Sequence, residues 1–236
     1  MNRQAVNPYL PSWEYIPDGE PHVFNGRVYV YGSHDRFNAP IFCVNDYVCW
    51  SAPVEDLSEW RYEGVIYRKK QDPKNPLGYH LLFAPDVCQG PDGRYYLYYA
   101  FDFLGIMSVA VCDTPAGEYK FLGHIHYADG TLWGRRRGDQ LPFDPGVLLD
   151  DDGRVWLYSG FYNAVPAILT GGHKLRCDGG TVLELEKDMV TIKTEPRVIF
   201  PKKGPGAFQG HEFFEASSIR KEGKTYIFVY SSRHNH

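Results

Sequence analysis

The sequence has no run of 18 uninterrupted apolar residues, and its N-terminal segment "MNRQAVNPYLPSWEY" has no apolar core. The first absence argues against a membrane-spanning helix, and the second argues against a secretory signal. We therefore expect a cytoplasmic protein, and we do not expect it to bind a membrane. Helical periodicity is also hard to find at any point of the chain, which argues against a helical domain.

Cysteine motifs with metal-ligand spacing are missing as well. The five cysteines are an odd number, lie far apart, and include no CxxC or paired Cys/His motif. Free and mostly buried thiols in a reducing compartment fit this pattern better than disulfides do. No zinc or other catalytic metal site is expected from these residues.

The chain also lacks an excess of positive charge. It has 25 Lys and Arg against 29 Asp and Glu, for a formal net charge of −4, and it has no long basic run. A nucleic-acid partner is therefore not expected. The densest basic patch, "GRRRGD" (134–139), is interpreted as a solvated loop, with the edge of a binding site as the alternative. The oligomeric state stays open.

Aromatic residues, in contrast, are abundant. The chain has 18 Tyr, 14 Phe and 5 Trp, which make up 16% of it, together with 24 Gly and 17 Pro. Aromatic side chains suit strands and cores, and they also form flat platforms for the apolar faces of sugars. The glycines and prolines indicate many turns.

An internal repeat organises these residues. Its four copies are "FNGRVYVYGS" (24–33), "PDGRYYLYYA" (91–100), "DDGRVWLYSG" (151–160) and "KEGKTYIFVY" (221–230). Each has a polar turn with a glycine, followed by a run of β-branched and aromatic residues, and each follows a shorter strand candidate. Such a pattern is a strong hairpin signal. Strands grouped in units of this length predict an all-β fold, a β-propeller.

An acidic residue precedes the glycine of every copy. The four acids are Asp18, Asp86, Asp144 and Glu215, which lie seven to nine residues before their glycines. Equivalent positions on successive propeller blades converge on one end of the central channel. For a single Asp, a role in a turn is the simpler interpretation. Four acids at one depth instead predict a functional site with perturbed pKa values. The "DDD" of 150–152 is interpreted as a hairpin turn.

The segments around these acids resemble glycoside hydrolase family 43. They are "NPYLPSWEYIPDGEPHVFNGRVYVYGSHD" (7–35), "FAPDV" (83–87), "FDPGVLLDDDG" (143–153) and "FFEASSIRKEGKTYIFVYSS" (213–232). The resemblance implies a five-bladed β-propeller that hydrolyses arabinose- and xylose-containing glycans with inversion. The chain would cover about three and a half blades, at 7–75, 76–135, 136–205 and an incomplete 206–236. We therefore expect a chain truncated at its C-terminus.

The resemblance also implies a role for each acid. Asp18 falls on the general base, Glu215 on the general acid, and Asp144 on the residue that orients the acid and raises its pKa. An inverting glycosidase needs an acid to protonate the leaving oxygen and a base to activate water from the opposite face. We expect the pKa of Glu215 to be raised by an ionised Asp144. For Asp86, hydrogen bonds to sugar hydroxyls and a role in holding the blade together are equally open.

Other candidate substrate-binding residues are His34, Phe143, Phe161 and His211. His34 and Asp35 end a predicted strand, so substrate contact and strand termination are both open. His211 lies four residues before Glu215, and a buried hydrogen-bonded histidine is the alternative. Phe143 and Phe161 are candidates for stacking on a sugar. No cofactor is expected to be required, although the resemblance leaves room for a structural Ca²⁺ in the central channel.

Two further functions remain open. The chain could be a non-catalytic or inactive carbohydrate-binding propeller, which would bind pentose oligosaccharides without turnover. It could instead be a related hydrolase that acts on fructosides with retention, although only "IPDGEP" stands where those enzymes carry an "NDPNG"-like motif. A glycosidase that removes terminal arabinofuranosyl or xylosyl residues is the prediction, with a pentose-containing oligosaccharide as its partner.

Overall fold

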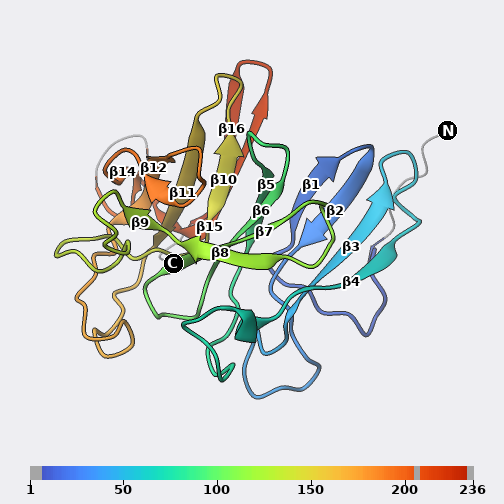
Figure 1. The fold of residues 1–236 in the computed structure, drawn as a ribbon, viewed down its shortest axis with the longest axis horizontal. Coiled ribbons are helices and arrows are strands. Elements are labelled where there is room, and N and C mark those ends of the chain that lie inside the picture. Colours follow the sequence, from blue (N-terminus) through green and yellow to red (C-terminus); the bar gives the residue numbers. More distant parts are fainter. Residues whose placement is uncertain (1–6, 205–207, 233–236) are drawn as a thin grey trace.

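A computed structural model describes residues 7–204 and 208–232, and nearly all its regular structure is β-strand (Figure 1). Within these ranges the one helical element is the short 3-10 helix η1 (Lys69–Gln71). No helix among the described residues is long and apolar enough to cross a membrane. The strands form four sheets that follow one another along the chain.

The four sheets are mostly antiparallel. The first consists of β1 (Glu20–Phe24), β2 (Arg27–Tyr31), β3 (Tyr47–Pro53) and β4 (Arg61–Tyr67). The second consists of β5 (Asp86–Gln89), β6 (Tyr95–Ala100), β7 (Met107–Cys112) and β8 (Lys120–His124). The third consists of β10 (Gly146–Leu149), β11 (Val155–Phe161), β12 (Gly179–Leu185), β13 (Thr191–Ile192), β14 (Arg197–Pro201) and β9 (His126–Tyr127). The fourth is the hairpin of β15 (Phe213–Glu222) and β16 (Thr225–Ser232).

The predicted repeat forms the first hairpin of each sheet. In the first sheet, Asn25 and Gly26 both have a positive φ, as the tight turn between β1 and β2 requires. Each predicted blade range contains one sheet, with one difference. The strand β9 lies in the range 76–135 but pairs in parallel with β13 of the third sheet. This short strand therefore links the second and third sheets.

The first strands of all four sheets surround a common space. Residues from β1, β5, β10 and β15 line a cavity of about 510 Å³, and β10 packs against both β5 and β15. A channel that is lined by the first strand of every sheet is the arrangement of a β-propeller. The predicted all-β propeller class is confirmed.

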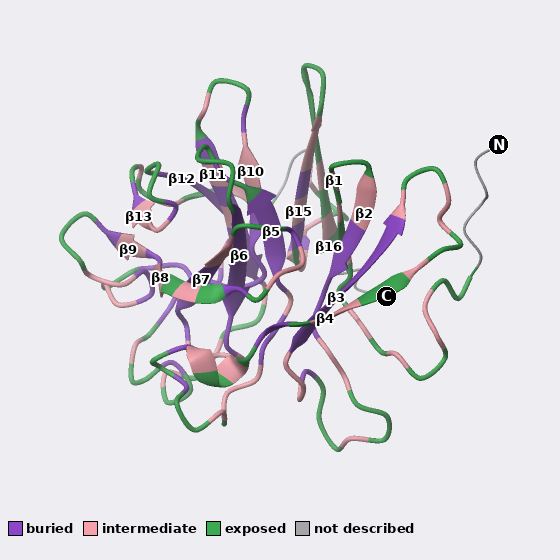
Figure 2. Cartoon of the chain, turned by 45° about the vertical axis from the view of Figure 1, so that its right-hand side comes forward, coloured by how far each residue is buried: buried purple, intermediate pink, exposed green. Residues whose placement is uncertain are grey.

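Aromatic side chains fill the space between neighbouring sheets. Figure 2 shows buried residues concentrated on the central strands and exposed residues in the loops and hairpin turns. Tyrosine hydroxyl groups join one sheet to the next: Tyr31 donates to the carbonyl of Pro115 at 2.7 Å, and Tyr98 donates to the carbonyl of Met189 at 2.9 Å. These residues bury a large apolar ring and still satisfy the hydroxyl group, which explains the abundance of tyrosine.

The third and fourth sheets approach each other closely at Gly146. A Cβ atom at this position would lie 2.6 Å from the carbonyl oxygen of Ser217, which is far closer than side chains tolerate. The close contact brings the start of β10 against the part of β15 that carries Glu215. A glycine is therefore required at position 146 for steric reasons.

We predict that Gly146→Ala destabilises the protein by about 1–3 kcal/mol, because the methyl group must push β15 away from β10. For a chain of this size, that change lowers the Tm by roughly 3–10 °C in a thermal unfolding measurement. The matched control is Gly123→Ala on β8, where a Cβ would lie at an ordinary 3.5 Å from Val190. An equal loss of Tm in both variants would contradict the steric explanation.

Candidate functional site

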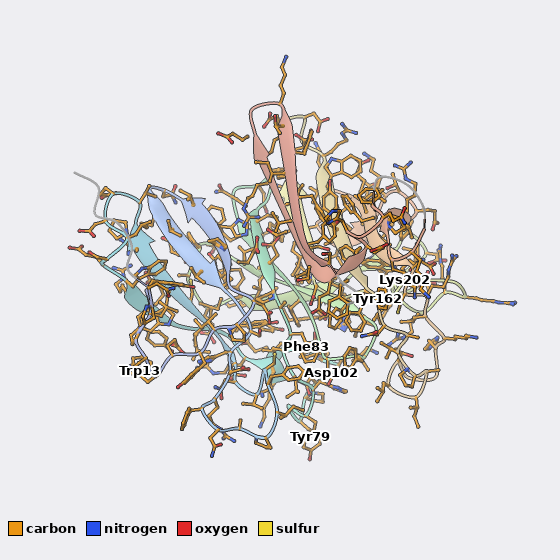
Figure 3. All side chains as sticks on the ribbon, turned by 180° about the vertical axis from the view of Figure 1, so that it is seen from behind. Trp13, Tyr79, Phe83, Asp102, Tyr162 and Lys202 are labelled. Carbon is orange, nitrogen blue, oxygen red and sulfur yellow. The ribbon has the colours of Figure 1, made fainter. Side chains whose placement is uncertain are left out.

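Three of the predicted acids line one pocket. Asp18, Asp144 and Glu215 face a cavity of about 300 Å³. The other residues of its wall are Pro17, Asp35, Phe42, Cys43, Phe83, Ala84, Phe143 and Phe161. Figure 3 labels Phe83, which lies near the middle of the molecule, away from the tip of the β15–β16 hairpin. The pocket is thus a cluster of carboxyl groups beside aromatic rings.

A left-handed backbone conformation occurs at or next to each of the three predicted acids of the pocket. Asp18 has a φ of 55°, Asp144 a φ of 45°, and Ala216, next to Glu215, a φ of 64°. Asp18 and Asp144 each lie two residues before the first residue of their strand. Ala216 lies within the register shift of β15, so the irregularity re-aims the neighbouring Glu215. Positive φ at non-glycine residues is uncommon and concentrates at functional sites.

The carboxyl group of Asp18 is held by a serine. The hydroxyl group of Ser33, which is fully buried, donates to Oδ2 of Asp18 at 2.5 Å. Ser33 follows the end of β2, and Asp18 precedes the start of β1. The end of one strand therefore positions the acid at the start of its neighbour. This hydrogen bond fixes the orientation of the Asp18 carboxyl group.

Asp144 and Glu215 form the buried part of the acid cluster. Burial raises the pKa of Asp144 well above its usual range, and the charges of Glu215 and Asp18 raise it further. The N–H of Ala216, which donates to Oδ2 of Asp144 at 3.1 Å, opposes this shift. Burial also raises the pKa of Glu215, followed by the charge of Asp18. The pKa of Glu215 is raised, as expected. The causes are burial and the charge of Asp18, whereas the sequence had suggested an ionised Asp144.

Asp86 does not belong to this pocket, because it is not in register with Asp144. Asp86 pairs with Tyr98 at the start of β5, and Gly146 pairs with Tyr158 at the start of β10. The counterpart of Asp144 in the second sheet is therefore Ala84. Both oxygens of Asp86 accept hydrogen bonds from the protein, including one at 2.6 Å from the N–H of Val147. Asp86 was expected either to bind sugar hydroxyls or to hold the blade together, and these contacts serve the second role.

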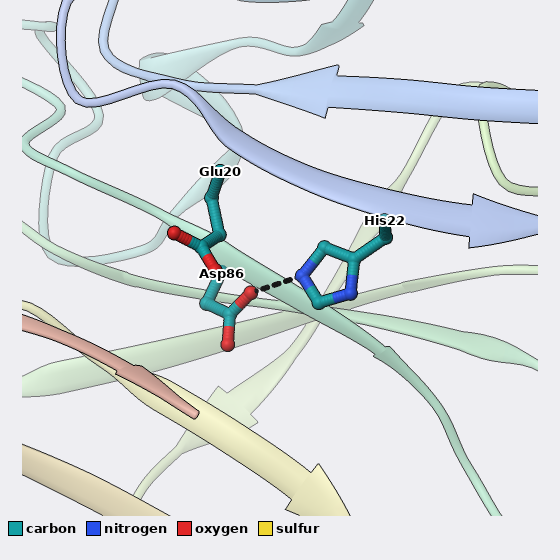
Figure 4. Close-up of side chains that lie close together, drawn as sticks. All are labelled: Glu20, His22 and Asp86. Atoms are coloured by element: carbon teal, nitrogen blue, oxygen red, sulfur yellow. Dashed lines mark hydrogen bonds and ion pairs between the residues drawn. The ribbon is translucent and has the colours of Figure 1, made fainter. Parts of the chain in front are cut away.

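Asp86 belongs to a second cluster, the channel cluster, in which His22 lines the 510 Å³ cavity. Figure 4 shows Glu20, His22 and Asp86, whose ligand atoms all lie within 4.8 Å of one another. Nε2 of His22 lies 2.6 Å from Oδ1 of Asp86, and Oε1 of Glu20 accepts from Ser218 and from Arg220. Ca²⁺ takes six to eight oxygen ligands, water molecules included, so these three side chains alone do not complete a site for it. One member is an imidazole, the guanidinium of Arg220 already compensates Glu20, and protein donors occupy both oxygens of Asp86.

The remaining predicted residues divide into two groups. Phe143 and Phe161 line the pocket, with their ring centroids 4.7 Å apart. His34 does not line it: its ring nitrogens lie 2.9 Å from the carbonyl of Asp46 and 2.9 Å from Oε1 of Glu14. His211 is exposed and is also absent from the wall, and its carbonyl accepts a hydrogen bond from Tyr230. The ring of His34 thus has structural contacts, and neither histidine lines the pocket.

Part of the pocket wall was not predicted. Phe83 could have been predicted from the sequence, because "FAPDV" and "FDPGV" place Phe83 and Phe143 at the same position of the repeat. Phe42 and Cys43 lie in the loop between β2 and β3, outside the repeated segment 24–33. Burial raises the pKa of the Cys43 thiol to about 12, and the charges of Asp35, Asp18 and Asp144 add to the shift. This thiol is therefore protonated.

Asp144 makes the folded protein less stable as the pH rises. A carboxyl group whose pKa is raised on folding contributes stability below its unfolded pKa and loses it as the pH rises through the folded pKa. We predict that Asp144→Asn raises the Tm, and raises it more at pH 8 than at pH 5, because the amide keeps an acceptor for the Ala216 N–H and cannot ionise. Thermal unfolding across this pH range measures the difference. A gain in Tm that does not depend on pH would contradict the assignment.

Comparisons with known proteins agree with this geometry. Residues 17–235 match the family model of glycosyl hydrolases family 43. The chain is 61% identical over 236 residues to a xylosidase/arabinosidase of Thermoclostridium stercorarium, which covers 98% of this chain and 48% of that protein. It is 31% identical over 256 aligned positions to xylosidase/arabinosidase 43A of Humicola insolens, which covers 94% and 74% of the two chains. The chain thus spans about half the length of the first relative.

A solved structure is also similar. CoXyl43, a β-xylosidase/α-arabinofuranosidase from a compost microbial metagenome, was solved with xylotriose in a calcium-free form. It superposes with a TM-score of 0.69 and 27% identity over 97% of this chain and 73% of that one. Family model, relatives and fold all lead to the same assignment, and the chain belongs to glycosyl hydrolases family 43.

Proposed function

We propose that the protein is an inverting glycosidase that removes terminal arabinofuranosyl or xylosyl residues from plant-type glycans. The observation that carries the proposal is the convergence of Asp18, Asp144 and Glu215 on one pocket. Inversion requires an acid and a base on opposite faces of the sugar, with room for a water molecule between the base and the sugar. The names of the two relatives, both xylosidase/arabinosidase, support the choice of pentose.

Two residues carry the proton transfers. Glu215, whose pKa is raised by burial and by Asp18, enters the reaction protonated and gives its proton to the glycosidic oxygen as the bond to the anomeric carbon breaks. Asp18, held by the hydroxyl group of Ser33, takes a proton from the water molecule that attacks the anomeric carbon from the opposite face. The products are a free sugar of inverted configuration and the shortened glycan.

Asp144 acts on Glu215 through the backbone and through the shared proton. Its hydrogen bond from the Ala216 N–H fixes the chain next to Glu215. Because the pKa values of both carboxyl groups are raised, the pair keeps a proton to a higher pH than free carboxyl groups do, and that proton belongs to the pair as a whole. Asp144 is thus a positioning residue.

The pocket wall suits one neutral sugar ring. Phe42, Phe83, Phe143 and Phe161 provide apolar faces, and within residues 7–204 and 208–232 no Lys or Arg lines the pocket. Carboxyl groups without a neighbouring cation disfavour sugars that are themselves anionic. The proposed reaction needs no metal, because side chains of the pocket supply both proton transfers and the channel cluster contributes none of them.

The proposal predicts that Asp18→Asn lowers kcat about 10²–10⁴-fold on every glycoside, since the base is needed whatever the leaving group. Glu215→Gln should cause a loss of that size on xylobiose or methyl pentosides and a smaller one on p-nitrophenyl pentosides, because nitrophenolate leaves without a proton. Kinetic measurements on both substrate classes test this. The matched control is Glu222→Gln, at the exposed turn end of the same strand β15.

Proton NMR of the first-formed sugar tests the stereochemistry, and an inverted anomer is expected. Retention would contradict the assignment of Asp18 as a base. Binding of pentose oligosaccharides without any turnover by the unmutated chain would instead support the non-catalytic carbohydrate-binding function.

A further inference from the structure

A loop of the first sheet brings one more carboxyl group to the pocket. This pocket loop (residues 35–46) connects β2 to β3, and three of its residues, Asp35, Phe42 and Cys43, line the cavity. The mechanism proposed above leaves Asp35 without a task. The sequence alone left substrate contact and strand termination equally open for this residue.

The pocket loop is held firmly at both ends. The backbone N–H of Asp35 donates to the carbonyl of Tyr15 at 2.9 Å, and its carbonyl accepts from Nδ2 of Asn45 at 2.8 Å. At the other end, Oδ1 of Asp46 accepts from the backbone N–H of Lys69 at 3.0 Å. The position of Asp35 is therefore defined before any ligand binds, which is what a specific polar contact requires.

The two oxygens of the Asp35 carboxyl group differ. Oδ1 accepts a hydrogen bond from the backbone N–H of Cys43 at 2.5 Å, which fixes the orientation of the group. Oδ2 has no hydrogen-bond or ion-pair partner among residues 7–204 and 208–232. A carboxylate oxygen can accept about two hydrogen bonds, so an oriented acceptor remains in the wall of the pocket.

The surroundings of Asp35 indicate what it binds. Phe42 and Phe83, with ring centroids 5.4 Å apart, stand in the same wall, so a ligand meets an apolar surface beside a charged acceptor. A sugar ring matches both features, because its faces are apolar and its edge carries hydroxyl donors. A uronic acid does not match, because its carboxylate would meet the carboxyl groups of the pocket.

We infer that Asp35 determines specificity by accepting, through Oδ2, a hydrogen bond from one hydroxyl group of the neutral sugar that occupies the pocket. The inference deepens the proposed function and rests on it for the identity of the ligand. Asp35 takes no part in proton transfer. Hydrogen bonds to charged groups are among the stronger ones in proteins, so the loss of this contact should weaken recognition about 10- to 100-fold.

The test is Asp35→Asn, which retains an oxygen for the Cys43 N–H and replaces the second oxygen with an amide. We expect kcat/KM for p-nitrophenyl pentosides to fall about 10- to 100-fold, mainly through KM. The limbs of the pH–rate profile should not move, because Glu215 and Asp18 are untouched. The matched control is Asp46→Asn, at the other end of the pocket loop and outside the pocket wall. Unchanged kinetics are expected, because asparagine keeps the oxygen that accepts from the Lys69 N–H.

Monodeoxy glycosides locate the hydroxyl group. The unmutated protein should lose about 10- to 100-fold on the one analogue that lacks the contacted hydroxyl, whereas Asp35→Asn should lose little more on that analogue than on the parent glycoside. An unchanged KM in Asp35→Asn would overturn the inference. The inference would also be overturned if Asp35→Asn and Asp46→Asn both had a lower Tm and lost activity equally. That result would assign Asp35 to the structure of the loop alone.

Calorimetric titration of the chain with xylose and with arabinose separates this inference from the proposed function, because binding needs no turnover. Affinity that depends on Asp35 in a chain without turnover would support the inference and overturn the proposed function. Turnover that is the same in Asp35→Asn and in the unmutated chain would support the function and overturn the inference.

Discussion

The hydrogen bond from the Ala216 N–H to Asp144 is the point on which both the fold and the site depend. It joins the third sheet to the fourth, and it does so directly beside Glu215. The contact is possible only because Gly146 lets the backbone of Ser217 approach β10. A bulkier residue at position 146 would separate the two sheets and the two acids together. The geometry of the acid pair is therefore a consequence of how two blades pack.

The same region is energetically costly. Asp18, Asp144 and Ala216 adopt left-handed backbone conformations, each of which costs about 1–3 kcal/mol at a non-glycine residue. Asp144 is also buried among other acids, which disfavours its charged form. The aromatic clusters between the sheets and the tyrosine hydrogen bonds that cross from one sheet to the next offset these costs. The abundance of tyrosine is thus connected to the site, because a rigid scaffold is what holds strained acids in place.

Much of the site could be predicted from the repeat, and its one clear failure is informative. The four acids lie at similar but unequal distances from their glycines. The turns of the second and third sheets both have five residues, between Gln89 and Tyr95 and between Leu149 and Val155. Asp86 lies seven residues before its glycine and Asp144 lies nine, so the two acids differ by two positions relative to their strands. Strand pairing shows that Ala84 is the equivalent of Asp144, which an approximate count from the glycine did not resolve.

The sequence by itself determined the strands, their hairpins, the propeller class and three acids of the pocket, because these features repeat and depend on local periodicity and turn chemistry. Only the tertiary structure decided which side chains complete the pocket. The path of the pocket loop, which carries Asp35 and Cys43, depends on contacts with Tyr15 and Lys69 that are distant in sequence. The raised pKa of Glu215 depends on burial between sheets. Neither the path of the loop nor the pKa of Glu215 leaves a local pattern in the sequence, because each depends on contacts between segments that are distant in sequence.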